Sequence, residues 1–103
     1  PQTTKPVVEN KLSTNNNLKT LTAEGYEIMK NDENNYYLEV SSHVEKIKIS
    51  AEGEDIKTKI KGIGEQDLTV GENIFEIILV SESGKKNIIN LNLVKKVFLV
   101  FFY

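Results

Sequence analysis

The chain of 103 residues contains no cysteine and no arginine. Without cysteine it has no disulfides, no thiol catalysis, no thiolate metal site and no redox switch. Without arginine it lacks the planar, bidentate side chain that is favoured for phosphate recognition. The formal net charge is −2, and lysines and acidic residues are interspersed. We therefore expect no basic surface that would gather nucleic acid.

Helical patterning and a targeting segment are also missing. No stretch combines an amphipathic stripe with helix caps. The chain begins at Pro1 with no initiator methionine and no basic or apolar leader. We expect either that a signal peptide has been removed or that this is a piece of a longer protein. The opening stretch, PQTTKPVVENKLSTNNN, is polar and aperiodic, and it predicts a linker over residues 1–16.

Apolar and polar residues alternate along most of the remaining chain, separated by short turns rich in glycine, asparagine and acidic residues. Alternation of this kind is typical of strands with one wet face, and the β-branched and aromatic content agrees with it. The pattern predicts an all-β, antiparallel sandwich. The residues expected to face the core in three of these strands are Tyr36, Leu38 and Val40, then Ile47 and Ile49, then Ile56, Thr58 and Ile60.

The most apolar part of the chain, NIFEIILV followed by SESG and KKNIINLNLV, predicts a hairpin of two strands. Apolar residues fall on both faces of these strands, which indicates either central strands with a partly covered outer face or a contact surface. The residues expected to face the core are Phe75, Ile77, Leu79, Ile89, Leu91 and Leu93.

Four features, taken in order, resemble one family. NLKTLTAEGYEI is similar to a Leu-x-x-Leu strand followed by Gly-Tyr, and YYLEV resembles a Tyr-x-Val-x-Val strand with Tyr36 in the Tyr position. GIGEQDLTVGENIFEIIL is close to Gly-x-Gly, then Leu-x-x-Gly-x-Asn, then an alternating strand. SESGKKNIINLNL resembles a closing hairpin, with Ile89 where Tyr is usual. The family is the bacterial cadherin-like β-sandwich domain, an immunoglobulin-like module of surface proteins in low-GC bacteria.

The resemblance implies an immunoglobulin-like antiparallel β-sandwich of about seven strands over residues 17–95. Gly71 would occupy a turn that needs a positive φ, and the side chain of Asn73 would bond nearby backbone. Met29 stands where the family has Phe-x-Pro, so that loop is expected to differ. Such modules are spacers or adhesive platforms with no catalytic residues to transfer. The motif positions are Tyr36, Gly62, Gly64, Gly71, Asn73 and Gly84.

The sequence offers little catalytic or metal chemistry. His43 is the only histidine, and its neighbours Ser41, Ser42 and Glu45 in SSHVE are local, whereas a catalytic triad needs three groups that converge. One histidine and no cysteine exclude a zinc site. NDENN and EGED supply oxygen ligands without an EF-hand spacing, so we interpret them as solvated turns and expect no cofactor. Scattered tyrosines such as Tyr26 and Tyr37 predict no sugar-binding platform.

The C-terminal stretch KKVFLVFFY ends in seven apolar residues, too few to span a hydrocarbon layer of about 30 Å. Residues 96–103 are therefore either the start of a membrane anchor or an extra strand that is covered by this domain or by another chain. The candidate interface residues are Phe98, Phe101, Phe102 and Tyr103.

Taken together, the patterns and the resemblance favour a non-catalytic, extracellular spacer or adhesion module of a larger bacterial cell-surface protein. Its expected partners are neighbouring domains of the same chain, or another surface protein or a glycan, and membrane proximity would come from the C-terminal tail. The alternative is an accessory domain that binds glycans or cell wall and is attached to a surface enzyme.

Overall fold

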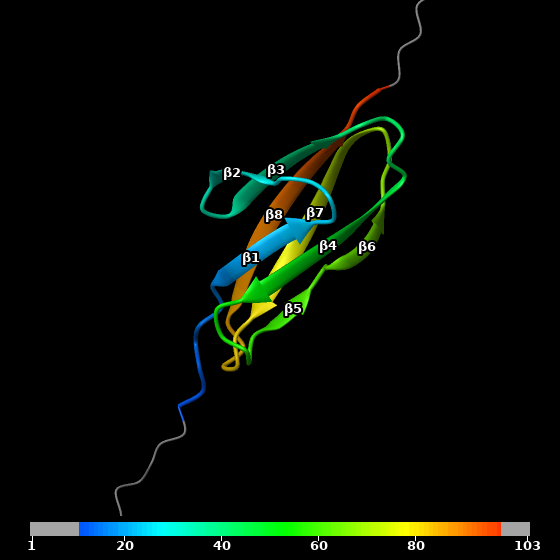
Figure 1. Cartoon of the computed structure of the whole chain (residues 1–103). Helices are drawn as coiled ribbons and strands as arrows, with labels where there is room; N and C mark the ends of the chain where they lie inside the picture. Colours follow the sequence, from blue (N-terminus) through cyan, green and yellow to red (C-terminus); the bar gives the residue numbers. More distant parts are fainter. Residues whose placement is uncertain (1–10, 98–103) are drawn as a thin grey trace, which may run out of the picture.

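The structure is a computed structural model that describes residues 11–97, and within that range it contains two β-sheets and no helix (Figure 1). The smaller sheet has three strands in the order β1-β4-β6. The larger sheet has five strands in the order β2-β3-β8-β7-β5. The all-β prediction is confirmed, and the two sheets share one apolar core.

The strands of the smaller sheet are β1 (Leu18–Ala23), β4 (Lys46–Gly53) and β6 (Gly64–Asp67). The strands of the larger sheet are β2 (Met29–Asp32), β3 (Asn35–Val40), β8 (Lys86–Lys95), β7 (Gly71–Val80) and β5 (Lys59–Lys61). Residues 11–97 form eight strands, compared with the expected seven or so. Met29, which stands where the resembled family has Phe-x-Pro, is the first residue of the short edge strand β2.

The sandwich is not wholly antiparallel, contrary to the prediction. The last strand, β8, pairs antiparallel with β7 on one side and parallel with β3 on the other. Alternation reports that a strand has one buried face, but it does not carry the direction of its neighbours, because side chains alternate in both kinds of sheet.

The core consists of inward-facing residues from both sheets. Ile77 and Leu79 of β7 and Leu91 and Leu93 of β8 have no exposed surface, and Phe75 packs against the core from the side. The facing predicted for the β7–β8 hairpin is therefore confirmed. The other buried apolar residues are Ala23, Leu38, Val40, Ile47, Ile49, Leu68 and Ile89.

The inward facing predicted for Ile56 is wrong, since this side chain is 97% exposed. Asp55 closes a turn here: its carboxylate accepts the Lys57 N–H at 2.9 Å, and its backbone carbonyl accepts the Thr58 N–H at 3.0 Å. The turn takes the chain out of the extended conformation, so the period-two pattern does not apply before β5. Ile60, within β5, is half-buried against the core as expected.

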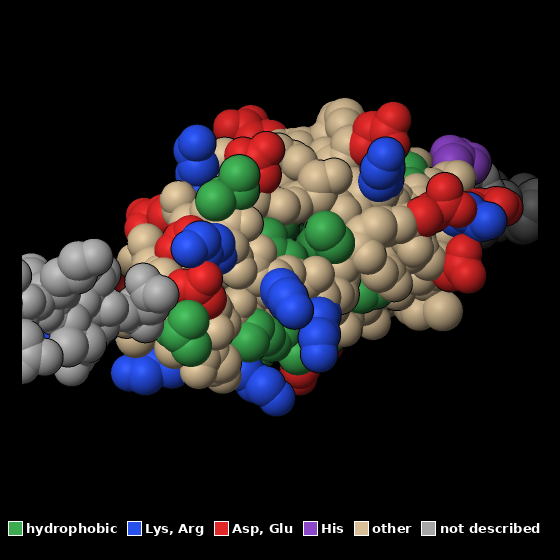
Figure 2. All heavy atoms as spheres, turned by 90° about the horizontal axis from the view of Figure 1, so that it is seen from below, with side chains coloured by type: hydrophobic (Ala, Val, Ile, Leu, Met, Phe, Trp, Pro, Cys, Tyr) green, Lys and Arg blue, Asp and Glu red, His purple; other side chains and the backbone are tan. Residues whose placement is uncertain are grey.

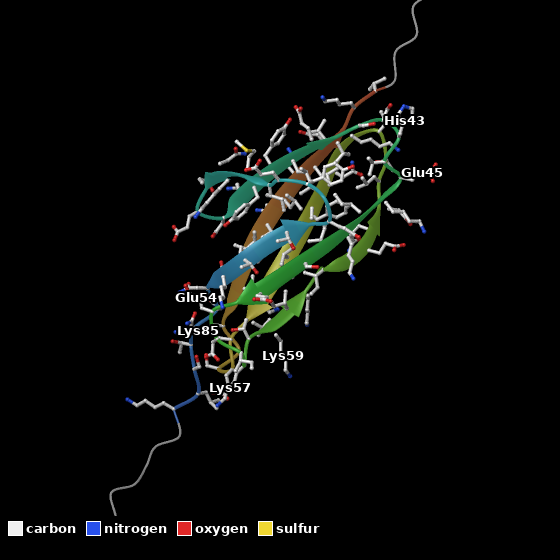
Figure 3. The ribbon with its side chains drawn as sticks, viewed as in Figure 1. His43, Glu45, Glu54, Lys57, Lys59 and Lys85 are labelled. Carbon is white, nitrogen blue, oxygen red and sulfur yellow. The ribbon has the colours of Figure 1, made fainter. Side chains whose placement is uncertain are left out.

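The described chain enters the sandwich at one end and leaves it at the other (Figure 1). The end that we call the N-terminal pole carries the entering residues 11–17, the β4–β5 connection and the β7–β8 turn. Glu54, Lys57, Lys59 and Lys85 mark this pole in Figure 3. His43 marks the opposite, C-terminal pole, where β8 ends beside β3 and the start of β7.

Candidate functional site

The side chain of Asn73 ties together three segments at the C-terminal pole. Its Oδ1 accepts the Thr69 N–H at 2.9 Å, and its Nδ2 donates to the carbonyls of Thr69 and Gly71 at 2.8 and 3.1 Å. The same Nδ2 lies 3.2 Å from the carbonyl of Leu93 in β8. Gly71 has a φ of +93°, which suits glycine in the turn that Asn73 closes. These bonds give Gly71 and Asn73 a structural role at this pole.

Gly62 allows β5 to approach β7 closely. A Cβ at this position would lie 2.1 Å from the backbone carbonyl oxygen of Glu76. Its φ of +86° also lies in the region that favours glycine. The remaining motif residues are structural as well, since Tyr36 packs against the core and Gly64 and Gly84 have positive φ values.

In the turn around His43, Ser41 accepts hydrogen bonds from two backbone N–H groups. The Oγ of Ser41 accepts the His43 N–H at 3.1 Å, and the Ser41 carbonyl accepts the Val44 N–H at 3.1 Å. The carbonyl of Glu45 accepts the Leu68 N–H at 2.9 Å. His43 and Glu45 lie at the same pole in Figure 3. The serine hydroxyl thus helps to close this turn.

The two acidic loops also use their carboxylates within turns. Asp32 accepts the Nδ2 of Asn35 at 2.7 Å and the N–H of Asn34 at 3.1 Å, and these bonds lower the pKa of Asp32 in that order. Within residues 11–97, no group of three or more His, Cys, Asp or Glu side chains is placed to hold a metal ion.

The tyrosines that sequence analysis considered for sugar binding lie in different places. Tyr26 pairs with Ala23 at the end of β1, whereas Tyr37 lies on the larger sheet. The hydroxyl of Tyr37 donates to the carboxylate of Glu39, which raises the pKa of Tyr37. The candidate interface residues Phe98, Phe101, Phe102 and Tyr103 lie outside the described residues.

Sequence analysis missed an anchored segment, Ser13–Asn17, which we call the entry clamp. The carbonyl of Ser13 accepts the Ser83 N–H at 3.0 Å in the β7–β8 turn. At the other end of the clamp, the carbonyl of Asn17 accepts the Glu54 N–H at 2.9 Å. Between them, the carbonyl of Asn15 accepts the Thr58 hydroxyl at 3.0 Å. The clamp thus bonds to both connections at the N-terminal pole.

Asparagine side chains extend this bonding to the start of β8. Asn16 donates through Nδ2 to the carbonyl of Lys85 at 3.2 Å, and its own carbonyl accepts the Nδ2 of Asn87 at 3.1 Å. The Nδ2 of Asn17 lies 3.1 Å from Oε1 of Glu54. Polar bonds of this kind leave no periodic apolar signal. The one available signal was the run of serine and asparagine, whose side chains favour local turns.

Ser13 is also the centre of a small charged cluster. Its N–H donates to Oε1 of Glu82 at 2.8 Å, and the Nζ of Lys57 lies 3.2 Å from Oε2 of the same carboxylate. The bond from Ser13 and, after it, the contact with Lys57 lower the pKa of Glu82. The Ser13 hydroxyl, followed by the Lys57 N–H, lowers the pKa of Asp55. The folded state therefore favours both carboxylates in their charged forms.

Two open cavities lie at the N-terminal pole. One, of about 460 Å³, has Ala51, Ile56 and Ile60 beside the charged side chains of Lys19 and Glu52. The other, of about 520 Å³, lies along β5 and the β7–β8 turn. Figure 2 shows hydrophobic side chains in small groups separated by lysine and acidic residues on the face it presents. The first cavity is also lined by Glu54, Asp55 and Thr58, whose side chains bond to the entry clamp or to the turn before β5.

Residues 11–97 contain no helix that could span a membrane. No family model matches the chain, and no curated protein and no solved structure matches it either.

Proposed function

We propose that this chain is a non-catalytic spacer module of a larger bacterial cell-surface protein, of the immunoglobulin-like, cadherin-like kind, working outside the cell. The observation that carries the proposal is that the described chain enters at one pole and leaves at the other (Figure 1). A module with this geometry adds its length to a chain of modules, because its neighbours attach at opposite ends.

The position of β8 supports a load-bearing role. This ten-residue strand runs between β3 and β7, with paired residues along its whole length on the β7 side. A pull between the two poles acts along β8, so its ladder bonds are loaded together. At the N-terminal pole the entry clamp bonds to the β4–β5 connection and the β7–β8 turn. The clamp would therefore pass the pulling force to both sheets.

Single-molecule pulling through cysteine handles tests this proposal, and the chain has no native cysteine to interfere. Handles at Lys11→Cys and Val97→Cys load the sandwich from pole to pole. Handles at Val70→Cys and Val97→Cys are the matched control, since both valines are 58% exposed and they flank the paired ends of β7 and β8. The control pair opens the hairpin one bond at a time.

We expect the pole-to-pole pair to unfold at the higher force, because many bonds must break together. Forced unfolding reports the unfolding rate under load, so the two pairs are compared at the same loading rate. Equal forces, or a lower force for the pole-to-pole pair, would overturn the load-bearing proposal.

A further inference from the structure

The larger sheet carries apolar side chains on the face that points away from the smaller sheet, which we call the outer face. Ile74 and Met29 are 64% and 60% exposed there, and Ile88 is 44% exposed. Ile74 and Ile88 alternate with core residues along β7 and β8, whereas Met29 lies in β2, whose four residues are all exposed. The apolar residues of the outer face are Met29, Tyr37, Ile74, Ile78, Val80, Ile88 and Val94.

Cross-strand pairing arranges these residues in two apolar rows on either side of a polar one. Met29, Tyr37, Asn92 and Ile74 form the row nearer the C-terminal pole. The row nearer the N-terminal pole contains Ile88, Ile78 and Lys61. Between them lie Asn35, Asn90 and Glu76. The two apolar rows are therefore placed symmetrically about the middle of the face.

Charges at the two ends of the outer face have opposite signs. Glu39 and Glu72 lie in one row at the C-terminal pole, where Lys96 approaches Glu39 to 3.8 Å. Lys59, Lys61 and Lys86 lie toward the N-terminal pole. With two carboxylates against Lys96, the C-terminal end of the face carries a net negative charge, and the opposite end carries lysines.

We propose that the outer face is a self-association surface on which a second copy of this chain packs with its strands running in the opposite direction. A two-fold axis across the strands places the acidic end of each copy on the basic end of its partner. It also places each apolar row on the other apolar row. A parallel arrangement would set lysine against lysine and glutamate against glutamate, so the charge pattern selects the antiparallel one.

The size of the outer face fits a weak dimer. The strands range from three residues in β5 to ten in β7 and β8, so at about 3.3 Å per residue and about 4.8 Å between strands the face offers on the order of 500 Å² per partner. Standard interfaces bury about 800 Å² per partner, so the dimer is expected at the weak end of that class. Two sheets that pack in this way lie about 10 Å apart. This inference is independent of the spacer role, which concerns the poles.

Sedimentation of the full chain over a range of concentrations provides the first test. Ile74→Asp and Ile88→Asp each place a charge in an apolar row, and we expect dimer dissociation to become at least tenfold easier, which is about 1.4 kcal/mol. Ile56→Asp is the matched control, because Ile56 is 97% exposed at the N-terminal pole and lies off the outer face. Equal weakening by Ile56→Asp would overturn the proposal.

Charge reversal tests the direction of packing. Lys59→Glu with Lys61→Glu gives both ends of the face a net negative charge although Lys86 remains, and Glu39→Lys with Glu72→Lys gives both ends a net positive charge. Each double variant alone should fail to dimerise, whereas an equimolar mixture should form a heterodimer that weakens as salt is added. A mixture that stays monomeric at concentrations where the native chain is dimeric would contradict antiparallel packing.

Glu76 provides a test in the direction of tighter binding. Glu76 lies in the middle row, so it faces Glu76 of the second copy at the two-fold axis. Glu76→Gln should therefore strengthen the dimer by removing a like-charge contact.

The apolar C-terminal tail is the competing explanation for any self-association. If Phe98→Ser, Phe101→Ser and Phe102→Ser together abolish association while Ile74→Asp leaves it intact, the tail and not the outer face joins the copies. A native chain that remains monomeric at millimolar concentration would also refute the proposal.

Discussion

At the scale of single residues, Asn73 shows how one polar side chain can fix a whole pole. It bonds to Thr69, to Gly71 and to the backbone of Leu93. Asn73→Ala should lower the free energy of unfolding by about 1–3 kcal/mol, because buried backbone groups lose their partners. Asn90→Ala is the control, since Asn90 lies on the outer face and its Nδ2 makes one long hydrogen bond, to Oδ1 of Asn35 at 3.5 Å. Denaturant melts that shift equally for both variants would contradict this role.

Gly62 is the residue at which added volume should cost most. Gly62→Ala forces a Cβ to within 2.1 Å of the Glu76 carbonyl oxygen, so β5 must move away from β7. Gly25→Ala shares the unfavourable positive φ but meets nothing within 4 Å. The difference between the two thermal midpoints therefore measures the steric clash alone. We expect Gly62→Ala to be the less stable by more than about 1 kcal/mol. Matching midpoints would show that β5 is free to shift.

At the scale of elements, we expect the entry clamp to make the free energy of unfolding depend on pH. The folded state lowers the pKa of Glu82, first through the Ser13 N–H and then through Lys57. A depressed carboxylate pKa contributes stability that is fully present above the ordinary glutamate value and is lost as the pH falls through the lowered value. Glu82→Gln should therefore flatten the acid side of the stability profile.

Urea melts at a series of acidic pH values measure this effect. Glu27→Gln is the matched control, because Glu27 is exposed between β1 and β2 and lies outside the clamp. If Glu82→Gln and the native chain lose stability along the same curve, Glu82 does not anchor Ser13 in solution.

The elements also show what alternation can and cannot predict. Strands β3, β4, β7 and β8 have the expected facing, because a period of two places every second side chain in the core. The inward facing predicted for Ile56 was wrong because the Asp55 turn interrupts the extended backbone. The entry clamp was out of reach for a different reason, since its stability comes from hydrogen bonds between segments far apart in sequence. The parallel pairing of β3 with β8 was equally invisible, because strand direction is a property of the assembled sheet.

At the scale of the whole molecule, charge is arranged more regularly than the sequence suggested. Lysines and acidic residues alternate along the chain, yet the pairing of β5, β7 and β8 gathers Lys59, Lys61 and Lys86 near one end of the outer face. A net charge of −2 gives no sign of this separation. Surface fields thus follow from topology as much as from composition.

From the parallel pair β3–β8 we expect a definite order of folding. Asn35 and its partner Asn90 are separated by more than half of the described chain. The larger sheet therefore cannot close before the final strand is available. The hairpin β7–β8 is local and can form early, whereas the docking of β3 must wait for a long loop to close. Both prolines, Pro1 and Pro6, precede residue 11, so refolding should show no slow isomerisation phase from within the sheets. A nascent chain therefore stays open, and exposed to proteases and chaperones, until its last strand has been made.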